Sequence, residues 1–438
     1  MKSINIGICG LGTIGAGTFN LIDQNSTIIT QRTGREIRVI QVSDLIDNPA
    51  CDLSSVDLSR DIFEVARNPQ VDILVELIGG TTTALKLILS AIENNKHVVT
   101  ANKALIAQHG REIFAAAEQK GVMVAYEASI GGGIPIVKAL REGLAANRVQ
   151  WIAGIINGTS NYILTEMEEK QRDFADVLSE AQQLGYAEAD PTFDIEGIDA
   201  AHKLTILSSI AFGHPLQFDQ AYTEGIAEIT QTDIRFASEL GYRIKHLGIT
   251  RRLEEGVELR VHPALIAKKD LLANISGVMN AVMVNSDAAG STMYYGAGAG
   301  AVPTASAVVA DIIDMTRSLD LPSAERIPYM SFQPEHIQEE KILPVSEIHS
   351  AYYLRMDVLD KPGEMANISR ILSEDQISIE ALIQKEAHTS GQEAPVPIVI
   401  ITDRVKESLM DHAIAAIEEI PDLRGRVTRI RVESLAGE

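Results

Sequence analysis

Two side chains of opposite charge stand four residues apart near the middle of the chain. Asp199 and Lys203 are separated by one helical turn, so a helix would place both on the same face. A neighbouring carboxylate favours the protonated form of a lysine, and an ammonium group can donate a proton to an oxygen on which negative charge develops. The pair fits a general acid with its partner, and it equally fits an ion pair on the surface of an amphipathic helix.

A glycine-rich string follows the first apolar run of the chain, Ile4–Cys9. In dinucleotide-binding turns of the pattern G-x-G-x-x-G, the first glycine permits a tight turn, the second lets a pyrophosphate approach the backbone, and the third allows a helix to pack closely on the sheet. The helix that follows presents free N–H groups to the anion. The position between a strand and a helix predicts a nicotinamide dinucleotide site, with a glycine turn that binds nothing as the alternative. The residues of the string are Gly10, Leu11, Gly12, Thr13, Ile14 and Gly15.

The end of the second predicted strand bears on the choice between NAD and NADP. An acidic side chain there favours the ribose 2′-hydroxyl, whereas an arginine accommodates a 2′-phosphate. The chain has Ser43 and Asp44 at this place, and Arg38 lies earlier on the same strand. Asp44 could bind the ribose or only cap a turn, so these residues do not decide between NAD and NADP.

The elements that must position these groups fall into three parts. Residues 1–150 alternate strand and helix signals, which predicts parallel βαβ units and a Rossmann-type nucleotide-binding domain. The strands are expected at Ile4–Cys9, Ile37–Val42, Val71–Leu77, His97–Thr100 and Val122–Tyr126, and the helices at Ala16–Asp23, Leu85–Ile92 and Ile113–Gln119.

The rest of the chain has a different pattern of predicted helices and strands. Residues 151–330 combine helical stretches with strand candidates at Gly241–Arg252, Glu258–His262 and Asn280–Ser286, which predicts an α+β catalytic and dimerisation domain. Residues 331–350 carry prolines and many charges and are interpreted as a linker. Residues 351–438 then follow a βαββαβ order typical of a ferredoxin-like domain. The expected elements are Tyr352–Val358, Met365–Glu374, Ile377–Glu386, Pro397–Thr402, Val405–Glu419 and Val427–Val432.

Composition excludes several classes of protein. The chain has 438 residues, of which 45% are hydrophobic, and its 60 acidic against 38 basic residues give a formal net charge of −22. This balance disfavours a general nucleic-acid binder. Two cysteines cannot form a disulfide framework, and no apolar run approaches the roughly 20 residues of a membrane helix. We therefore expect a cytoplasmic protein with no membrane partner.

Five strings of residues resemble those of homoserine dehydrogenases that carry a C-terminal ACT domain. They occur in the family's order over nearly the whole length, and the last is the most specific. The strings are Thr100–Lys103, Tyr126–Pro135, Gly154–Tyr162, Gly185–Pro191 and Asp194–Lys203. The resemblance implies NAD(P)-dependent interconversion of aspartate 4-semialdehyde and homoserine, in the biosynthesis of threonine, methionine and isoleucine.

The resemblance also implies roles for individual residues. Lys203, Lys103 and Asp199 become the catalytic groups, and Lys103 also contacts the cofactor. Glu188 becomes the partner of the substrate ammonium group, for which a carboxylate is suited, and Asp199, Lys103, Asn157 and Thr159 complete the substrate site. Gly185 and Gly300 become further cofactor contacts. The carbonyl groups of Glu127, Ile130, Gly132 and Ile134 become ligands of a sodium ion, a hard cation that suits oxygen donors.

The chain departs from the family at Ser43, where NADP-using relatives commonly carry an arginine, so we expect NAD or both cofactors to be accepted. Tyr352–Arg355 and the loop at 360–363 resemble an ACT domain, which implies a threonine effector and a homodimer or homotetramer; a domain kept only for oligomerisation is the alternative. A thioester-forming semialdehyde dehydrogenase is rejected because neither Cys9 nor Cys51 is placed as a nucleophile. An amino-acid-sensing regulatory protein on a dehydrogenase scaffold remains as the non-catalytic reading.

Overall fold

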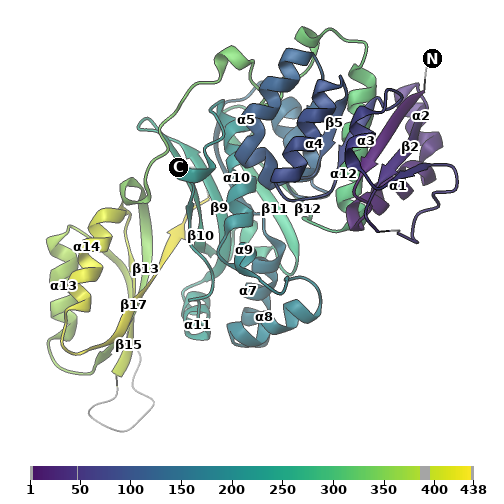
Figure 1. Ribbon diagram of the computed structural model, residues 1–438. Helices are drawn as coiled ribbons and strands as arrows, with labels where there is room; N and C mark the ends of the chain where they lie inside the picture. The colour runs from purple at the N-terminus through teal and green to yellow at the C-terminus, as the bar shows by residue number, and fades with distance from the viewer. Residues whose placement is uncertain (1–2, 47, 385–394, 436–438) are drawn as a thin grey trace.

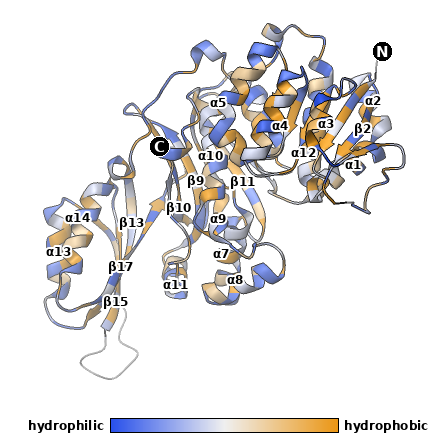
Figure 2. Cartoon of the chain, viewed as in Figure 1, coloured by the Kyte–Doolittle hydropathy of each residue, from blue (hydrophilic) through white to orange (hydrophobic). Residues whose placement is uncertain are grey.

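The computed structural model describes residues 3–46, 48–384 and 395–435. Two sheets organise the chain, and Figure 1 shows the first at the N-terminal end, the second through the middle, and a helix-covered extension of the second at the C-terminal end. Apolar residues gather on the strands and on the helix faces that cover them, as Figure 2 shows. Among the described helices, none is long and apolar enough to cross a membrane.

The first sheet has six parallel strands and the strand order of a doubly wound nucleotide-binding domain. The predicted fold class is therefore confirmed. In spatial order the strands are β3 (Asp57–Ser59), β2 (Ile37–Ser43), β1 (Ile4–Cys9), β4 (Ile73–Glu76), β5 (His97–Thr100) and β6 (Val124–Ala125).

Helices cover both faces of this sheet. One face packs on α3 (Ile62–Arg67), α4 (Thr82–Glu93) and α5 (Lys103–Lys120). The other packs on α1 (Thr13–Gln24), α2 (Ser26–Thr33) and α12 (Ala301–Ser318). Because α12 comes from the segment 151–330, that segment contributes to the nucleotide-binding fold as well as to its own sheet; Figure 1 shows α12 beside β5 and α1.

The second sheet has eleven strands and joins the central and C-terminal parts of the chain. Its spatial order is β12 (Gly290–Ala297), β11 (Met279–Ser286), β7 (Val149–Ile155), β9 (Tyr242–Arg252), β10 (Val257–Ala267), β17 (Leu423–Glu433), β13 (His349–Leu359), β15 (Pro395–Thr402) and β14 (Ile379–Gln384), with β8 (Tyr222–Thr223) paired to β10 and β16 (Val405–Lys406) paired to β13. The central strands carry α7 (Gly158–Lys170), α8 (Phe174–Gln183), α10 (Ile198–Phe212) and α11 (Gln231–Glu239).

The C-terminal part has the predicted βαββαβ order. Helices α13 (Glu364–Glu374) and α14 (Glu407–Glu418) cover one face of its strands, and the other face packs toward α11 and α7. The predicted strand at 377–386 is β14, and residues 385–386 lie outside the described residues. The segment interpreted as a linker lies against the body, because Ile342 is buried and pairs with Val257, and β13 begins at His349, within the predicted linker range.

Strand β17 joins the C-terminal domain to the central one through parallel pairing with β10. Buried charges accompany this pairing. The Arg260 guanidinium on β10 contacts the Glu433 carboxylate on β17 and, at 2.9 Å, that of Glu258. On β17, Arg431 contacts Glu407 of α14 and, at 2.6 Å, Glu224 of the central domain. The two domains are therefore held by a shared sheet and by buried ion pairs.

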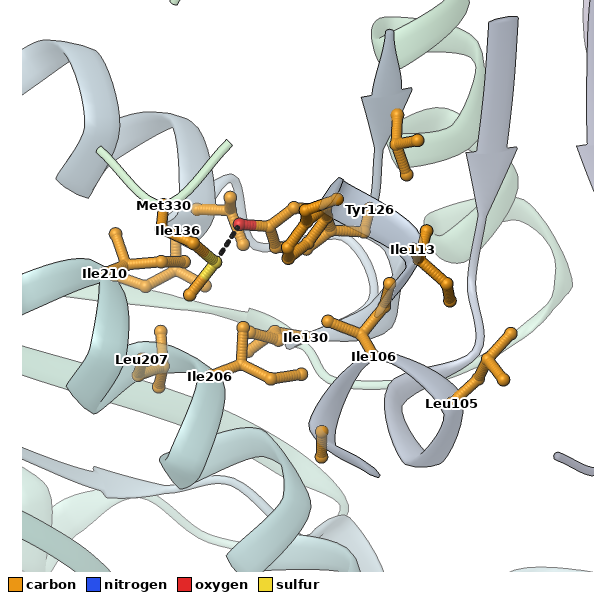
Figure 3. Packing of buried hydrophobic residues seen from close by; sticks show 14 of the residues in the cluster. Leu105, Ile106, Ile113, Tyr126, Ile130, Ile136, Ile206, Leu207, Ile210 and Met330 are labelled. Carbon is orange, nitrogen blue, oxygen red and sulfur yellow. Dashed lines mark hydrogen bonds between the residues drawn. The ribbon is translucent and has the colours of Figure 1, made fainter. Parts of the chain in front are cut away.

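An apolar core lies between α5 and α10 and fixes how these two helices meet. Figure 3 shows side chains of both helices packed around Tyr126, whose hydroxyl lies 3.4 Å from the Met330 sulfur. Other members are Leu105, Ile106 and Ile113 on α5, Ile206, Leu207 and Ile210 on α10, and Ile130 and Ile136 between them. This contact matters because both helices carry predicted site residues.

The buried ion pair of Glu433 should contribute strongly to stability. Glu433→Gln keeps the size of the side chain but leaves the Arg260 guanidinium with one fewer charged partner in a buried place. We expect the free energy of unfolding to fall by about 3 kcal/mol, measured by urea unfolding followed through the single tryptophan, Trp151. Glu347→Gln is the control, since its ion pair with Lys341 is exposed. Equal urea midpoints for the two variants would contradict this role.

Candidate active site

Asp199 is the centre of the candidate site. It is the second residue of α10, and its side chain is 6% exposed. Its Oδ2 lies 2.6 Å from Nζ of Lys203, one turn further along the helix, and its Oδ1 lies 3.1 Å from Nζ of Lys103, the first residue of α5. The structure thus brings together the three residues predicted to be catalytic, with Asp199 and Lys203 buried and the Lys103 side chain partly exposed.

The helix start at Asp199 depends on a glycine. Gly197 caps α10 with φ +81°, and a Cβ there would lie 2.9 Å from Val261 and 3.1 Å from the His246 ring. A larger residue would meet both a steric clash and an unfavourable backbone conformation. The close fit lets α10 begin against the second sheet, so that Asp199 lies in its first turn, where the helix dipole favours a negative charge.

Polar groups from the turn between β7 and α7 complete the surroundings of Asp199. The Asn157 amide donates to Asp199 at 2.9 Å and to Asp194 at 2.7 Å, and its oxygen accepts from Ser160 N to cap α7. The Ile156 carbonyl accepts from Lys203 Nζ at 2.8 Å. Thr159, predicted beside Asn157 in the substrate site, is oriented differently: its hydroxyl donates to the Tyr186 carbonyl at 2.6 Å.

These contacts separate the proton affinities of the two lysines. Burial acts to raise the pKa of the Asp199 carboxyl, but Lys203 and Lys103 together hold it well below its usual range. Asp199 raises the pKa of Lys103, whereas burial and then the charge of Lys103 act to lower the pKa of Lys203. Lys203 is therefore the ammonium group that gives up its proton more readily.

His202 links the two helices beside this cluster. Its ring stacks on Phe218 at 4.0 Å between centroids, and its Nε2 lies 3.2 Å from the Gln108 amide on α5. Burial lowers the pKa of His202 to about 4, so the neutral ring accepts the hydrogen bond from Gln108. Together with the apolar core, this contact fixes the start of α5 against the start of α10.

Glu188 and Gly185 lie in the turn after α8, at the exposed side of the cluster. Glu188 is exposed, and its charge contributes to the raised pKa of Lys103. Gly185 is also exposed, and a Cβ there would meet no atom within 4 Å. Glu188 is therefore placed where a small molecule that reaches Lys103 could also reach its carboxylate.

The glycine-rich turn forms a cradle at the carboxyl end of β1. A Cβ on Gly10 would lie 2.6 Å from the Leu77 carbonyl oxygen, and one on Gly15 would lie 1.9 Å from that of Gly10, whereas the space above Gly12 is open. The turn includes Leu11, Thr13 and Ile14, and α1 begins at Thr13. This is the fit that a pyrophosphate requires, with open backbone at the second glycine and a helix N-terminus beyond it.

A cavity of about 550 Å³ extends from this turn along the ends of β2 and β3. Asp44 lines it, but both carboxylate oxygens already accept backbone hydrogen bonds, from Leu11 N and Ile46 N. Arg38 does not line this cavity; its guanidinium pairs with the Glu36 carboxylate at 2.6 Å, near the start of β2. Arg60 lines the cavity instead and donates to the Asp44 carbonyl at 2.8 Å. Sequence reasoning missed Arg60, because it follows a short strand that carries no strong pattern.

Gly300 and the predicted cation loop lie beside α12. Gly300 precedes α12 with φ +115°, and a Cβ on Gly132 would lie 2.7 Å from the Gly298 backbone, so the two loops touch. The Glu127 carbonyl accepts from Ile130 N at 3.2 Å, and its carboxylate accepts from Val137 N and Lys138 N. Ile134 N donates to Gly131. Within this loop the predicted ligand carbonyls of Glu127 and Ile134 already accept backbone hydrogen bonds, from Ile130 N and Ile136 N.

Comparison with known families matches all three parts of the chain. The family described as homoserine dehydrogenase matches residues 135–313, its NAD-binding domain matches residues 10–127, and the ACT domain matches residues 352–422. The chain is 59% identical to a homoserine dehydrogenase of Pseudomonas aeruginosa over 435 residues, which is 99% of this chain and 100% of that protein. It is 54% identical to one from Neisseria gonorrhoeae, with 99% and 100% covered.

Solved structures agree with these sequence matches. The crystal structure of a homoserine dehydrogenase from Thiobacillus denitrificans superposes with a TM-score of 0.94 at 55% identity, covering 99% of each chain. A hyperthermophilic archaeal homoserine dehydrogenase in complex with NADPH has a TM-score of 0.62 at 26% identity, covering 73% of this chain and 99% of that one.

Proposed function

The chain belongs to the homoserine dehydrogenase family and is an oxidoreductase that acts on a CH–OH group, and from this premise we propose that Asp199, Lys103 and Lys203 form its catalytic centre for interconverting aspartate 4-semialdehyde and homoserine. The observation that carries the proposal is the buried Asp199 carboxylate shared by two ammonium groups, that of Lys203, which is buried, and that of Lys103, which is partly exposed. A bound nicotinamide supplies the hydride.

Lys203 is the proton donor in this proposal. Reduction of an aldehyde leaves negative charge on its oxygen, and an ammonium group beside that oxygen both stabilises the charge and neutralises it. Burial acts to lower the pKa of Lys203, so its proton is transferred more easily, and the Asp199 carboxylate keeps it charged until then. Lys103, whose pKa is raised by Asp199, stays protonated and serves to bind and orient the substrate and cofactor.

The amino-acid end of the substrate is assigned to the exposed rim of the site. Glu188 would accept the substrate ammonium group, and its place near Lys103 supports this. Asn157 and Thr159 would lie on the same side of the site. Asn157 is held there by its hydrogen bond to Asp199, and Thr159 by its hydrogen bond to the turn that bears Glu188. Gly185 and Gly300 leave open backbone where the cofactor would pass.

A monovalent cation is proposed for the loop from Glu127 to Ile134. Carbonyl oxygens of Glu127, Ile130, Gly132 and Ile134 are hard donors that suit sodium. Two buried carboxylates lie beside the loop: burial and Asp311 raise the pKa of Glu127 to about 7, and the Asp311 carboxylate accepts from Glu127 N. A cation there would tie the loop to α12.

Threonine is the proposed effector of the C-terminal domain, in a homodimer or homotetramer. The support is the ACT match and the route by which that domain meets the site. Arg431 of β17 holds the Glu224 side chain at 2.6 Å, the Glu224 carbonyl contacts the His246 ring at 3.0 Å, and that ring packs on Gly197 at the start of α10. In the described chain, β12 and β14 end the sheet, which leaves strand edges open to a second copy.

Removal of the proposed proton donor should abolish most of the turnover. We expect Lys203→Ala to lower kcat by about 10²-fold with little change in the KM for the nicotinamide. In the parent enzyme, reduction should slow as pH rises through the pKa of Lys203, because only the ammonium form donates. Lys170→Ala is the matched control, since Lys170 also pairs with a carboxylate four residues away, but its own side chain is exposed. Turnover within a few fold of the parent would remove Lys203 from the mechanism.

Arg60 should set the balance between the two nicotinamides. A guanidinium in the cavity can pair with a 2′-phosphate, so NADP should be accepted as well as NAD despite Ser43. Arg60→Gln should raise the KM for NADP by about 10-fold, a loss of roughly 1.4 kcal/mol, and should leave the KM for NAD nearly unchanged. Arg38→Gln, which removes a cation outside the cavity, should change neither value. Equal effects on both cofactors would show that Arg60 does not contact the 2′-phosphate.

The ion pair between Arg431 and Glu224 should transmit inhibition by threonine. A chain cut near residue 344 would lose five strands of the shared sheet, β13 to β17, so a point variant is the cleaner test. Glu224→Gln should raise the threonine concentration for half inhibition by about 5-fold or more, measured with homoserine and NADP, while calorimetry shows threonine still bound. Asp411→Asn, which breaks an ion pair with Arg429 inside the domain, is the control. Unchanged inhibition in Glu224→Gln would exclude this route.

A further inference from the structure

A second buried carboxylate lies at the carboxyl end of the first sheet, apart from the catalytic cluster. Glu76 is the last residue of β4, and its exposure is 0%. Burial raises the pKa of its carboxyl group, and an ionised carboxylate in such a place must be compensated by hydrogen-bond donors. The donors that Glu76 finds come from the loop after β4 and from the last residue of β5.

Each carboxylate oxygen of Glu76 accepts hydrogen bonds from a different one of these two places. Oε1 accepts from the backbone N–H groups of Ile78 and Gly79, at 3.0 and 3.2 Å, in the turn that leads to α4. Oε2 accepts from the Thr100 hydroxyl at 2.6 Å, at the end of the neighbouring strand β5. One side chain therefore fixes the loop after β4 to the end of β5.

The hydroxyl of Thr100 extends this link to α5. It donates its hydrogen to Glu76 and accepts from Asn102 N at 3.0 Å. Asn102 in turn donates to the Gly80 carbonyl at 2.6 Å and accepts from Leu105 N at 3.1 Å, which caps α5. Lys103 is the next residue, the first of the helix. With Glu76 ionised, the Thr100 hydroxyl must donate to it, because a carboxylate can only accept; the other bonds have their direction set by backbone N–H and carbonyl groups.

Lys103 needs such a support. It places a positive charge at a helix N-terminus, where the helix dipole opposes it, and its Nζ must still reach Asp199 at 3.1 Å across the boundary between the two sheets. A small rotation at the start of α5 would move the ammonium group away from Asp199.

We propose that Glu76 is a positioning residue for Lys103, acting through Thr100 and Asn102 to fix the first turn of α5 in the orientation that brings the ammonium group to Asp199. The proposal rests on the catalytic role proposed for Lys103. It assigns to Glu76 no contact with the substrate or the cofactor.

The test is a double-mutant cycle in the full-length enzyme. Glu76→Gln places an amide N–H₂ where an acceptor is needed, so it should lower kcat about 10-fold in the parent and less than about 2-fold in the Lys103→Ala background. A loss of equal size in both backgrounds, or no loss in the parent, would overturn the proposal. Glu407→Gln removes a buried carboxylate of the C-terminal domain and should have the same effect, whatever its size, in both backgrounds.

Thr100 provides an independent cycle that decides the matter where Glu76→Gln folds poorly. Thr100→Val removes the hydroxyl at constant shape and should reproduce the 10-fold loss of kcat, again only when Lys103 is present. Thr100→Ser restores the hydroxyl and should recover most of the turnover. Failure of the serine variant to recover it would show that the hydroxyl is not the link. Full turnover by Lys103→Ala alone would instead refute the proposed role of Lys103, a result that does not depend on either cycle.

Discussion

A carboxylate buried between two ammonium groups is the constraint on which the rest of the candidate site depends. Removing the charges of Asp199 and Lys203 from water is costly, and mutual attraction offsets that cost only when the geometry is close to ideal. Asp199 therefore requires that the first turn of α10 and the first turn of α5 meet within hydrogen-bond distance. The apolar core around Tyr126 and the contact between His202 and Gln108 hold the two helices in this arrangement.

The molecule uses buried charge a second time, at the boundary between its central and C-terminal domains. Arg260 and Arg431 lie on adjacent strands and find carboxylates in both domains. Apolar contacts alone would hold the two domains together, but they specify orientation weakly. Charged groups that must each find a partner tolerate far fewer arrangements, so the register of β17 against β10 is closely defined.

Much of this structure can be predicted from the sequence, and the features that could not be predicted share a physical cause. The Rossmann-type and βαββαβ parts follow from local patterns, and the spacing of Asp199 and Lys203 indicates their contact. The first turns of α5 were not predicted, because apolar periodicity identified only Ile113–Gln119; the signal was Asn102, a good N-cap residue. The place of Lys103 beside Asp199, of Arg60 in the cavity and of α12 on the first sheet arise from contacts between distant segments, which periodicity does not report.

The position of β17 has a consequence for the way the chain matures. Glu433 meets Arg260 across a sequence separation of 173 residues, so β10 emerges during synthesis long before the strand that covers its edge. Until then β8 pairs with this edge at Arg260 and Val261, but the backbone groups of β10 from Ala264 to Ile266 lack their partner, the condition that promotes association between nascent chains. Contacts so far apart in sequence also form slowly. Pairing with β17 therefore completes this edge of β10, and a chain truncated before β17 would leave the edge open to other chains.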